Sequence, residues 1–169
     1  DVRGGIGIMF KKLAVLVFTF SVLLGGLCMA DKAGPLPVSE ASLGGITLGS
    51  SMSYVKSIYG APTERGWVRA RFTNGTIANL YGKGFYIVEY PDKPKVLELY
   101  VNAHNGIATP MGIAVGVPKS TVDRLYGSST YSQGKYYYYT RNAIAIMIVY
   151  GNDTNGVTVV KSIHIQYQS

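Results

Sequence analysis

The chain has few residues from which a covalent or metal site could be built. Its 169 residues include one cysteine, Cys28, and two histidines, His104 and His164. A single cysteine cannot form a disulfide within the chain. A zinc site needs three or four ligands at suitable spacing, and two separated histidines do not supply them. We therefore expect solvent-facing histidines, no metal and no cofactor.

Patterns that accompany catalysis are also missing. No Gly-x-Ser-x-Gly turn is present to expose a nucleophilic serine. The glycines do not follow the spacing of a phosphate-binding loop. The carboxylates are scattered, mostly near turns, and no pair suggests general acid–base work. These absences favour a protein that is not an enzyme.

Positive charge is in excess but is not concentrated. The chain has 16 Lys and Arg residues against 9 Asp and Glu, a net charge of +7. No Lys/Arg run resembles a nucleic-acid-binding tract, so nucleic acid is not an expected partner. The excess would favour anionic envelope surfaces or an acidic partner. A soluble surface with some surplus lysine explains it equally well.

The first part of the chain has the order of a secretory signal. Two lysines follow Met9, an apolar run covers residues 13–24, and small residues lead to Ala30. The run is shorter than the roughly 20 residues that a membrane-spanning helix needs. We predict a signal peptide at residues 9–30, cleaved after Ala30, with residues 1–8 as upstream sequence. The product would be exported to a periplasmic or extracellular location.

Cys28 leaves an alternative to simple cleavage, namely lipid modification. Residues 25–27, Gly-Gly-Leu, depart from the lipoprotein pattern, which has an aliphatic residue three before the cysteine and a small one directly before it. Cleavage after Ala30 is therefore favoured. Contact with a membrane is expected only through the signal segment or through a lipid on Cys28. Residues 31–42 contain Gly34, Pro35 and Pro37, show no periodicity and are predicted to be a tether.

One pattern occurs twice in the remaining chain. Gly-Ile-x-x-Gly is followed by an amphipathic segment that ends in Tyr-Gly, first at residues 45–60 and again at residues 112–127. Apolar residues in these segments fall at helical spacing. Ser50 or Ser51 can cap the first helix, and Pro118 suits the first turn of the second. The closing glycines should end both helices in the left-handed conformation. Helices are thus predicted at residues 51–60 and 119–127.

Strand patterns follow each helix. Residues 67–72 alternate, with Val68, Ala70 and Phe72 on one face, before a hairpin signal at residues 74–75. Further strands are expected at residues 77–81, 85–90, 96–101, 136–140, 143–150 and 157–167. The expected core pairs Val55, Ile58, Val122 and Leu125 of the helices with Leu99, Val101, Ile163 and Ile165 of the closing strands.

These elements predict an α+β fold of two tandem repeats, at residues 43–109 and 110–169. In each repeat a short helical unit packs on an antiparallel β-sheet. The repeated Gly-Ile-x-x-Gly and Tyr-Gly pattern, followed by strands, resembles the tandem-repeat fold of beta-lactamase-inhibitor proteins. It also resembles the small lipoproteins of the outer-membrane barrel-assembly machinery. The resemblance implies the fold, and it places no inhibitory or assembly residue in this chain.

The expected function is that of an exported, non-enzymatic binding module of a bacterial-type cell envelope, whose partner is a protein or an envelope component. An envelope structural or assembly lipoprotein is one alternative, and a cell-wall-directed enzyme or ligand carrier is another. The sheet face without helices must meet water or a partner. The residues predicted to line it are Trp67, Arg69, Arg71, Tyr100, Tyr137, Tyr139 and His164. Aromatic and arginine side chains dominate binding hot spots, although aromatic cross-strand pairs can also serve stability alone.

Overall fold

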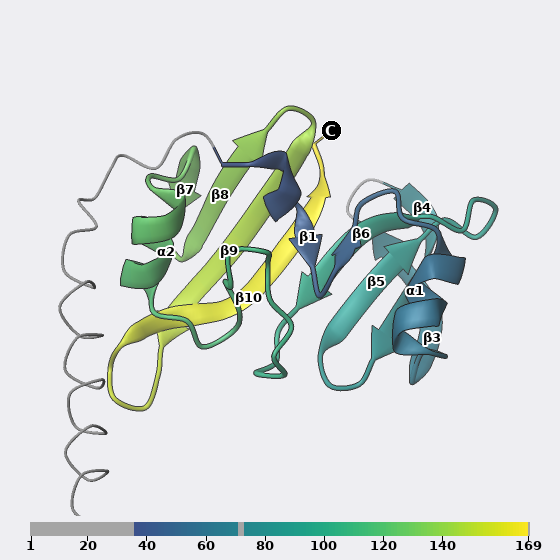
Figure 1. Cartoon of the computed structure of the whole chain (residues 1–169), viewed down its shortest axis with the longest axis horizontal. Helices are drawn as coiled ribbons and strands as arrows, with labels where there is room; N and C mark the ends of the chain where they lie inside the picture. The colour runs from purple at the N-terminus through teal and green to yellow at the C-terminus, as the bar shows by residue number, and fades with distance from the viewer. Residues whose placement is uncertain (1–35, 71–72, 169) are drawn as a thin grey trace, which may run out of the picture. The chain divides into compact units, whose positions relative to one another are not determined.

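The computed structural model describes residues 36–70 and 73–168, which form an α+β unit with one large antiparallel sheet (Figure 1). Within these residues, neither α-helix has the length and apolar character that crossing a membrane requires. The elements, in chain order, are the 3-10 helix η1 (Val38–Glu40), β1 (Ser42–Leu43), β2 (Ile46–Thr47), α1 (Met52–Tyr59), β3 (Glu64–Ala70), β4 (Thr73–Tyr81), β5 (Phe85–Glu89), β6 (Val96–Val101), α2 (Lys119–Tyr126), β7 (Tyr131–Gln133), β8 (Tyr136–Arg141), β9 (Ile144–Asn152) and β10 (Thr158–Tyr167).

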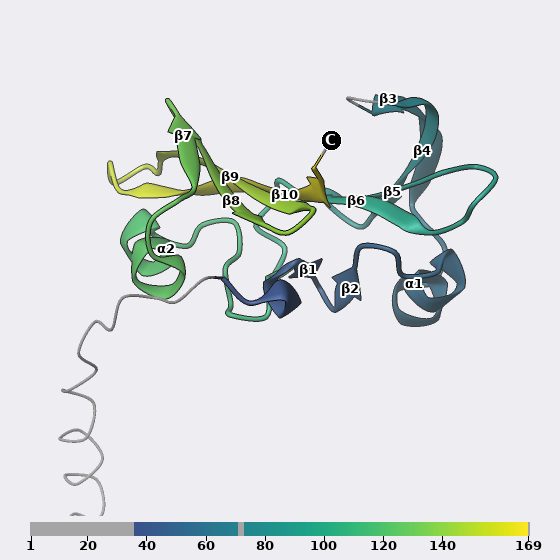
Figure 2. The ribbon, with the colours of Figure 1, turned by 90° about the horizontal axis from the view of Figure 1, so that it is seen from above.

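The sheet has eight strands in the order β3-β4-β5-β6-β10-β9-β8-β7, and each strand runs antiparallel to its neighbours. The strands that follow α1 therefore form one half and those that follow α2 form the other. The two halves join where β6 pairs with β10, with Val101 opposite Ile163 and Leu99 opposite Ile165. Both α-helices and the small β1–β2 ribbon lie on the same side of the sheet (Figure 2).

The helices begin and end close to the predicted residues, although their caps differ in detail. Ser51 caps α1, because its hydroxyl accepts a hydrogen bond from the Tyr54 N–H at 3.2 Å. Pro118 precedes α2 as its cap residue instead of lying in the first turn. Gly60 and Gly127 have the positive φ that glycine adopts without strain, at 75° and 70°, but their ψ is −151°. The left-handed helical ending is therefore wrong, and a glycine that combines a positive φ with an extended ψ redirects the chain instead.

The core contains most of the residues predicted for it. Val55, Val122 and the four closing-strand residues Leu99, Val101, Ile163 and Ile165 are fully buried, and Leu125 is half-buried. Ile58 is instead 47% exposed. The apolar stripe of α1 passes through Met52, Val55 and Tyr59, and at 3.6 residues per turn Ile58 lies roughly a quarter turn away from its centre.

The end of the segment predicted to be a tether is packed against the rest of the protein. Glu40, Ala41 and Ser42 are buried, and Leu43 follows them into the core. The Tyr126 hydroxyl of α2 donates to Glu40 Oε2 at 2.6 Å and lies 2.9 Å from Thr109 Oγ1. A buried carboxylate needs such a partner because leaving water is costly. The tether prediction is therefore wrong for residues 40–42, and residues 31–35 lie outside the described part.

The contact between Glu40 and Tyr126 predicts how removal of the Tyr126 hydroxyl changes stability. Burial raises the pKa of Tyr126 well above its usual value, and the hydrogen bond to Glu40 raises it further, so the phenol remains a donor. Tyr126→Phe removes the donor and leaves the Glu40 carboxylate buried without it, which should lower the free energy of unfolding by about 2–3 kcal/mol. Urea unfolding measures this. The control is Tyr54→Phe on the exposed side of α1, which should change little. Equal stability of the two variants would contradict the assigned role.

Candidate binding surface

The sheet has one covered and one uncovered face. The α-helices and the β1–β2 ribbon cover the first, and no described element lies across the second (Figure 2). The sheet ends at β3 and at β7 rise on the uncovered side, which makes that side concave in Figure 2. We call this side the open face. Because side chains alternate along a strand, the residues between the buried ones point to it.

One line of residues crosses the open face with a member from every strand. The register pairs Tyr131 with Tyr138, Tyr138 with Met147, and Met147 with His164. The line continues from His164 to Tyr100 and on through β5 and β4 to β3. This cross-strand row consists of Tyr131, Tyr138, Met147, His164, Tyr100, Tyr86, Leu80 and Glu64. Seven steps at the usual strand spacing give a length of roughly 34 Å.

Neighbouring rings in the row are in contact. The Tyr100 ring lies between Tyr86 and His164, with centroid distances of 5.8 Å to each. Tyr131 and Tyr138 form a similar pair at 5.7 Å. Tilted and edge-to-face contacts at such distances are favourable for aromatic side chains. The rings therefore support each other, and Tyr100 and His164 meet edge to face.

A hydrogen-bonded pair lies in the middle of this surface. His164 Nε2 is 3.2 Å from Glu98 Oε2, and both side chains are mostly buried. His164 thus differs from the solvent-facing histidine that the sequence predicted, whereas His104 is exposed. No group of three or more His, Cys, Asp or Glu residues in the described chain is arranged to hold a metal ion.

Two of the predicted surface residues lie together on the open face, and two others lie on the covered side. Tyr100 and His164 pair directly, as expected from their positions beside the buried Leu99 and Ile163. Tyr139 and Tyr137 were predicted on the wrong face. Tyr139 is 4% exposed and its ring lies 5.2 Å from that of Tyr126 in α2. Burial is the main cause that raises the pKa of Tyr139 above its usual value.

Tyr137 packs on the same covered side. Its ring lies 5.0 Å from that of Tyr150, and the Lys119 ammonium of α2 lies 4.8 Å from its centre. The neighbouring strand explains the inversion, because Tyr137 and Tyr139 pair with the buried Ile148 and Ile146. Tyr136 and Tyr138 therefore occupy the open face instead.

The other predicted surface residues cannot be placed on a face. The β3 backbone pairs Trp67 with Ile77. The side chains of Trp67 and Arg69, and all of Arg71, lie outside the described residues, as do the side chains of Val68, Ala70 and Phe72. Cys28 also lies outside them. Their assignment stays a prediction.

Sequence reasoning missed several members of the row, although a local signal was present for two. Tyr86 lies between the buried Phe85 and Ile87, and Met147 lies between the buried Ile146 and Ile148. Strict alternation within these strands would have placed both on the open face. The row itself could not be found this way, because it depends on the order of the strands.

The covered side has two open hollows, and the Tyr81 hydroxyl beside the first is buried with no hydrogen-bond partner among the described residues. A hollow of about 320 Å³ adjoins the end of α1, where Asn105 donates to the Lys83 carbonyl and Thr63 accepts from the Gly82 N–H. A second, of about 390 Å³, adjoins the end of α2, where Lys119 is paired with Asp123. Thr63, Asn105 and Lys119 are thus already bonded within the protein.

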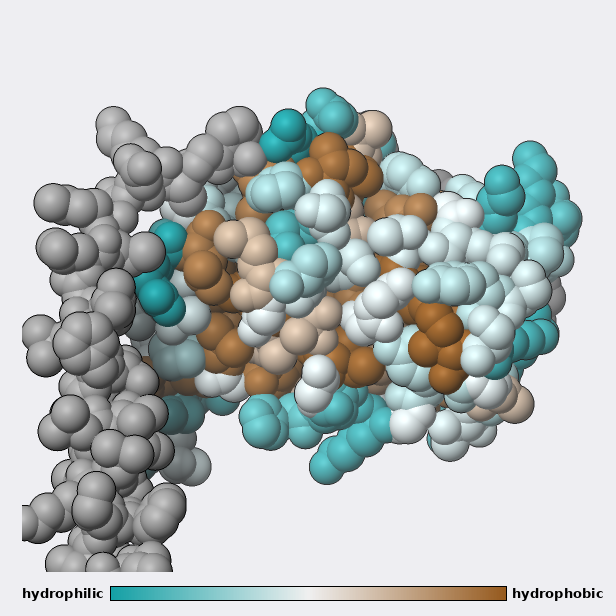
Figure 3. All heavy atoms as spheres, viewed as in Figure 1, coloured by the Kyte–Doolittle hydropathy of each residue, from teal (hydrophilic) through white to brown (hydrophobic). Residues whose placement is uncertain are grey.

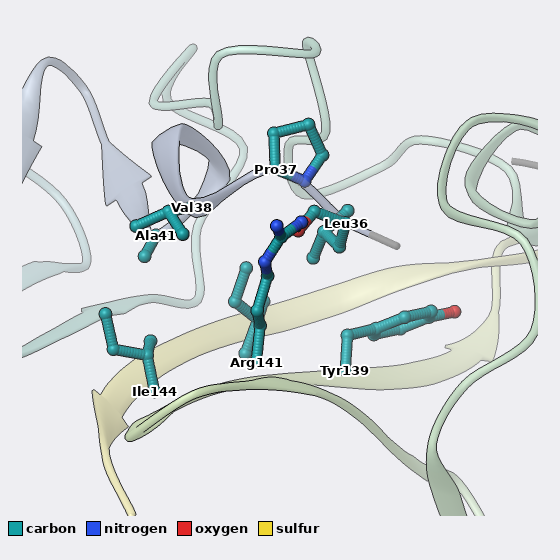
Figure 4. Close-up of a pocket in the computed structure, with 8 residues that line it drawn as sticks. Leu36, Pro37, Val38, Ala41, Tyr139, Arg141 and Ile144 are labelled. Atoms are coloured by element: carbon teal, nitrogen blue, oxygen red, sulfur yellow. The ribbon is translucent and has the colours of Figure 1, made fainter. Parts of the chain in front are cut away.

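A smaller pocket lies where the described chain begins (Figure 4). Its volume is about 10 Å³, room for about one water molecule. Arg141 crosses it and donates to the Leu36 carbonyl at 2.6 Å, between the side chains of Pro37 and Tyr139. The contact between Arg141 and Leu36 therefore holds the first described residues against the sheet. The pocket has no space for a larger ligand.

Apolar residues also reach the surface on the covered side, in separate patches between polar ones (Figure 3). Single exposed apolar residues, such as Ile58 on α1, are normal on soluble proteins.

No family model and no curated protein matches the chain. A crystal structure of a cysteine-rich secretory protein from Staphylococcus aureus is similar in fold, with a TM-score of 0.50 and 11% sequence identity. The likeness covers 80% of this chain and 48% of that one, so the chain spans about half the length of that protein. At this identity the comparison concerns the fold alone. The likeness to beta-lactamase-inhibitor proteins stays a prediction from the sequence.

Neighbouring tyrosines of β8 should respond differently to truncation. Tyr139→Ala opens a cavity under α2 and should cost about 3–5 kcal/mol, as for other large aromatic core residues. Tyr138→Ala removes a half-buried side chain from the open face and should cost about 1 kcal/mol or less, the size of a cross-strand pair. Urea unfolding of both variants measures the difference. A larger loss for Tyr138→Ala would show that the two faces are assigned the wrong way round.

Proposed function

We propose that the chain is an exported, non-enzymatic binding module, built from two tandem repeats, whose open face binds another protein. The observation that carries this proposal is the cross-strand row. It places five aromatic or imidazole rings and a methionine on six strands of an uncovered face. Tyrosine and methionine are enriched in protein interfaces.

The repeat is supported by the order of the elements. α1 is followed by four strands and so is α2, and each helix ends at a glycine with positive φ and extended ψ. The last strands of the two sets, β6 and β10, pair with each other at the centre of the sheet. An approximate two-fold relation between the halves accounts for this order.

The contacts within the row favour a protein partner over a glycan. A sugar stacks on an exposed aromatic face, but the rings of Tyr86, Tyr100 and His164 contact one another at centroid distances of 5.8 Å, which leaves less of each ring free for stacking. Because these rings lose little freedom on binding, they give contact area at a low cost in entropy.

A photo-crosslinking residue at Tyr100 tests the proposal directly. The exported chain carrying it should form a discrete protein adduct when illuminated in envelope extract from the source cells, and excess unlabelled protein should compete the adduct away. The matched control carries the same residue at Tyr54, which is exposed on α1. That variant should give no competed adduct.

A second measurement separates binding from folding. Tyr86→Ala combined with Tyr100→Ala should abolish the adduct formed from a crosslinker at Tyr138, while the free energy of unfolding falls by no more than about 2 kcal/mol, the size of two cross-strand pairs. Adducts that form from Tyr54 and not from Tyr100 would place the interface on the covered side. An absence of any competed adduct would refute the open face as a protein-binding surface.

A further inference from the structure

A lysine on β10 lies over the open face. Lys161 stands between the buried Val160 and Ser162, where the pairing with β9 shifts by one residue. Its side chain lies against Gly151, so that a β-carbon added to Gly151 would meet Lys161 Cγ at 3.1 Å and Cε at 3.2 Å. Because Tyr150 points into the core, the next residue, Gly151, faces the open side. The Lys161 side chain therefore extends across that side.

A second lysine adjoins the same part of the sheet. The Lys135 ammonium lies 5.7 Å from the centre of the Tyr136 ring. Tyr136 is exposed, and it alternates with the inward-facing Tyr137. It pairs with Val149, which in turn pairs with Ser162, the neighbour of Lys161. We call Lys135, Tyr136 and Lys161 the basic corner.

The basic corner adjoins the cross-strand row, because Tyr136 and Tyr138 are two residues apart on β8 and so share its open side. The corner therefore adds positive charge at one flank of a surface that is otherwise mainly aromatic.

The charge of the corner is not balanced by the acidic residues that the structure describes. Glu40, Glu89, Glu98 and Asp123 each have a partner elsewhere. Asp153, in the hairpin that leads to β10, accepts hydrogen bonds from the backbone N–H groups of residues 155 and 157. Within the described residues no carboxylate pairs with Lys135 or Lys161. Uncompensated lysines of this kind attract negative charge.

We propose that the basic corner receives an acidic segment of the protein partner, while the cross-strand row contacts its apolar residues. This inference rests on the proposed function and adds the chemistry of the partner. Lysines placed beside tyrosines suit a segment in which carboxylates alternate with apolar side chains, because each kind of side chain then meets its complement. Rim charges of this type mainly set the rate and the salt dependence of association.

The test uses a ten-residue glutamate peptide as the probe, titrated into the isotope-labelled exported chain and followed by NMR. At low salt the amide shifts should be confined to the basic corner and the adjoining parts of β8, β9 and β10, and they should weaken as salt is added. A neutral glycine–serine peptide of equal length should produce none. Polygalacturonate serves as an anionic glycan of a different class.

Charge reversal supplies the matched comparison. Lys135→Glu with Lys161→Glu should weaken binding of the glutamate peptide roughly tenfold, since two attractive contacts become repulsive. Lys56→Glu with Lys93→Glu makes the same change in net charge at exposed sites on α1 and in the loop before β6, and it should have little effect. Melting temperatures of both double variants should stay close to that of the parent.

Several results would overturn the inference. They are equal weakening by the two double variants, shifts spread over the covered side, no shifts at all, or binding of polygalacturonate without binding of the peptide. None of these results depends on whether the crosslinker at Tyr100 forms an adduct. A failure of the acidic-segment inference can therefore be told apart from a failure of the proposed function.

Discussion

The structure depends on the pairing of β6 with β10. This pair joins the strands that follow α1 to those that follow α2, and it buries Leu99, Val101, Ile163 and Ile165 completely. Val55 of α1 and Val122 of α2 belong to the same core cluster. A half on its own would be a small unit with a marginal core, because small domains bury a lower fraction of their surface. One continuous sheet gives both helices a common core.

The same pairing decides what the open face presents. Side chains alternate strictly along each strand, so the register that buries Leu99 and Ile165 also brings Tyr100 opposite His164. A register shift of one residue would place the buried residues on the open face and the open-face residues in the core. The covered side gains further constraint from Glu40 and Tyr126, which link the first described residues to α2. All described covering elements lie on one side, and this leaves the aromatic side free.

Local patterns in the sequence predicted the helices and most of the core, because capping residues, glycines and apolar spacing act over a few residues. They failed where the deciding contact was distant. Four consecutive tyrosines carry no difference in polarity, and the buried Ile146 and Ile148 of β9 determine which of them face the core. Glu40 appeared to belong to a tether because its partner Tyr126 lies 86 residues away.

The cross-strand row shows why a surface of this kind escapes a sequence pattern. Its members come from eight strands whose spatial order, with β10 between β6 and β9, differs from their order in the chain. The row is continuous only while β6 and β10 are paired, since Tyr100 and His164 form its central link. Opening this pair would divide the core and the row at the same place. Recognition through the row would therefore require the two halves to act as one folded unit, even if each half arose as a separate repeat.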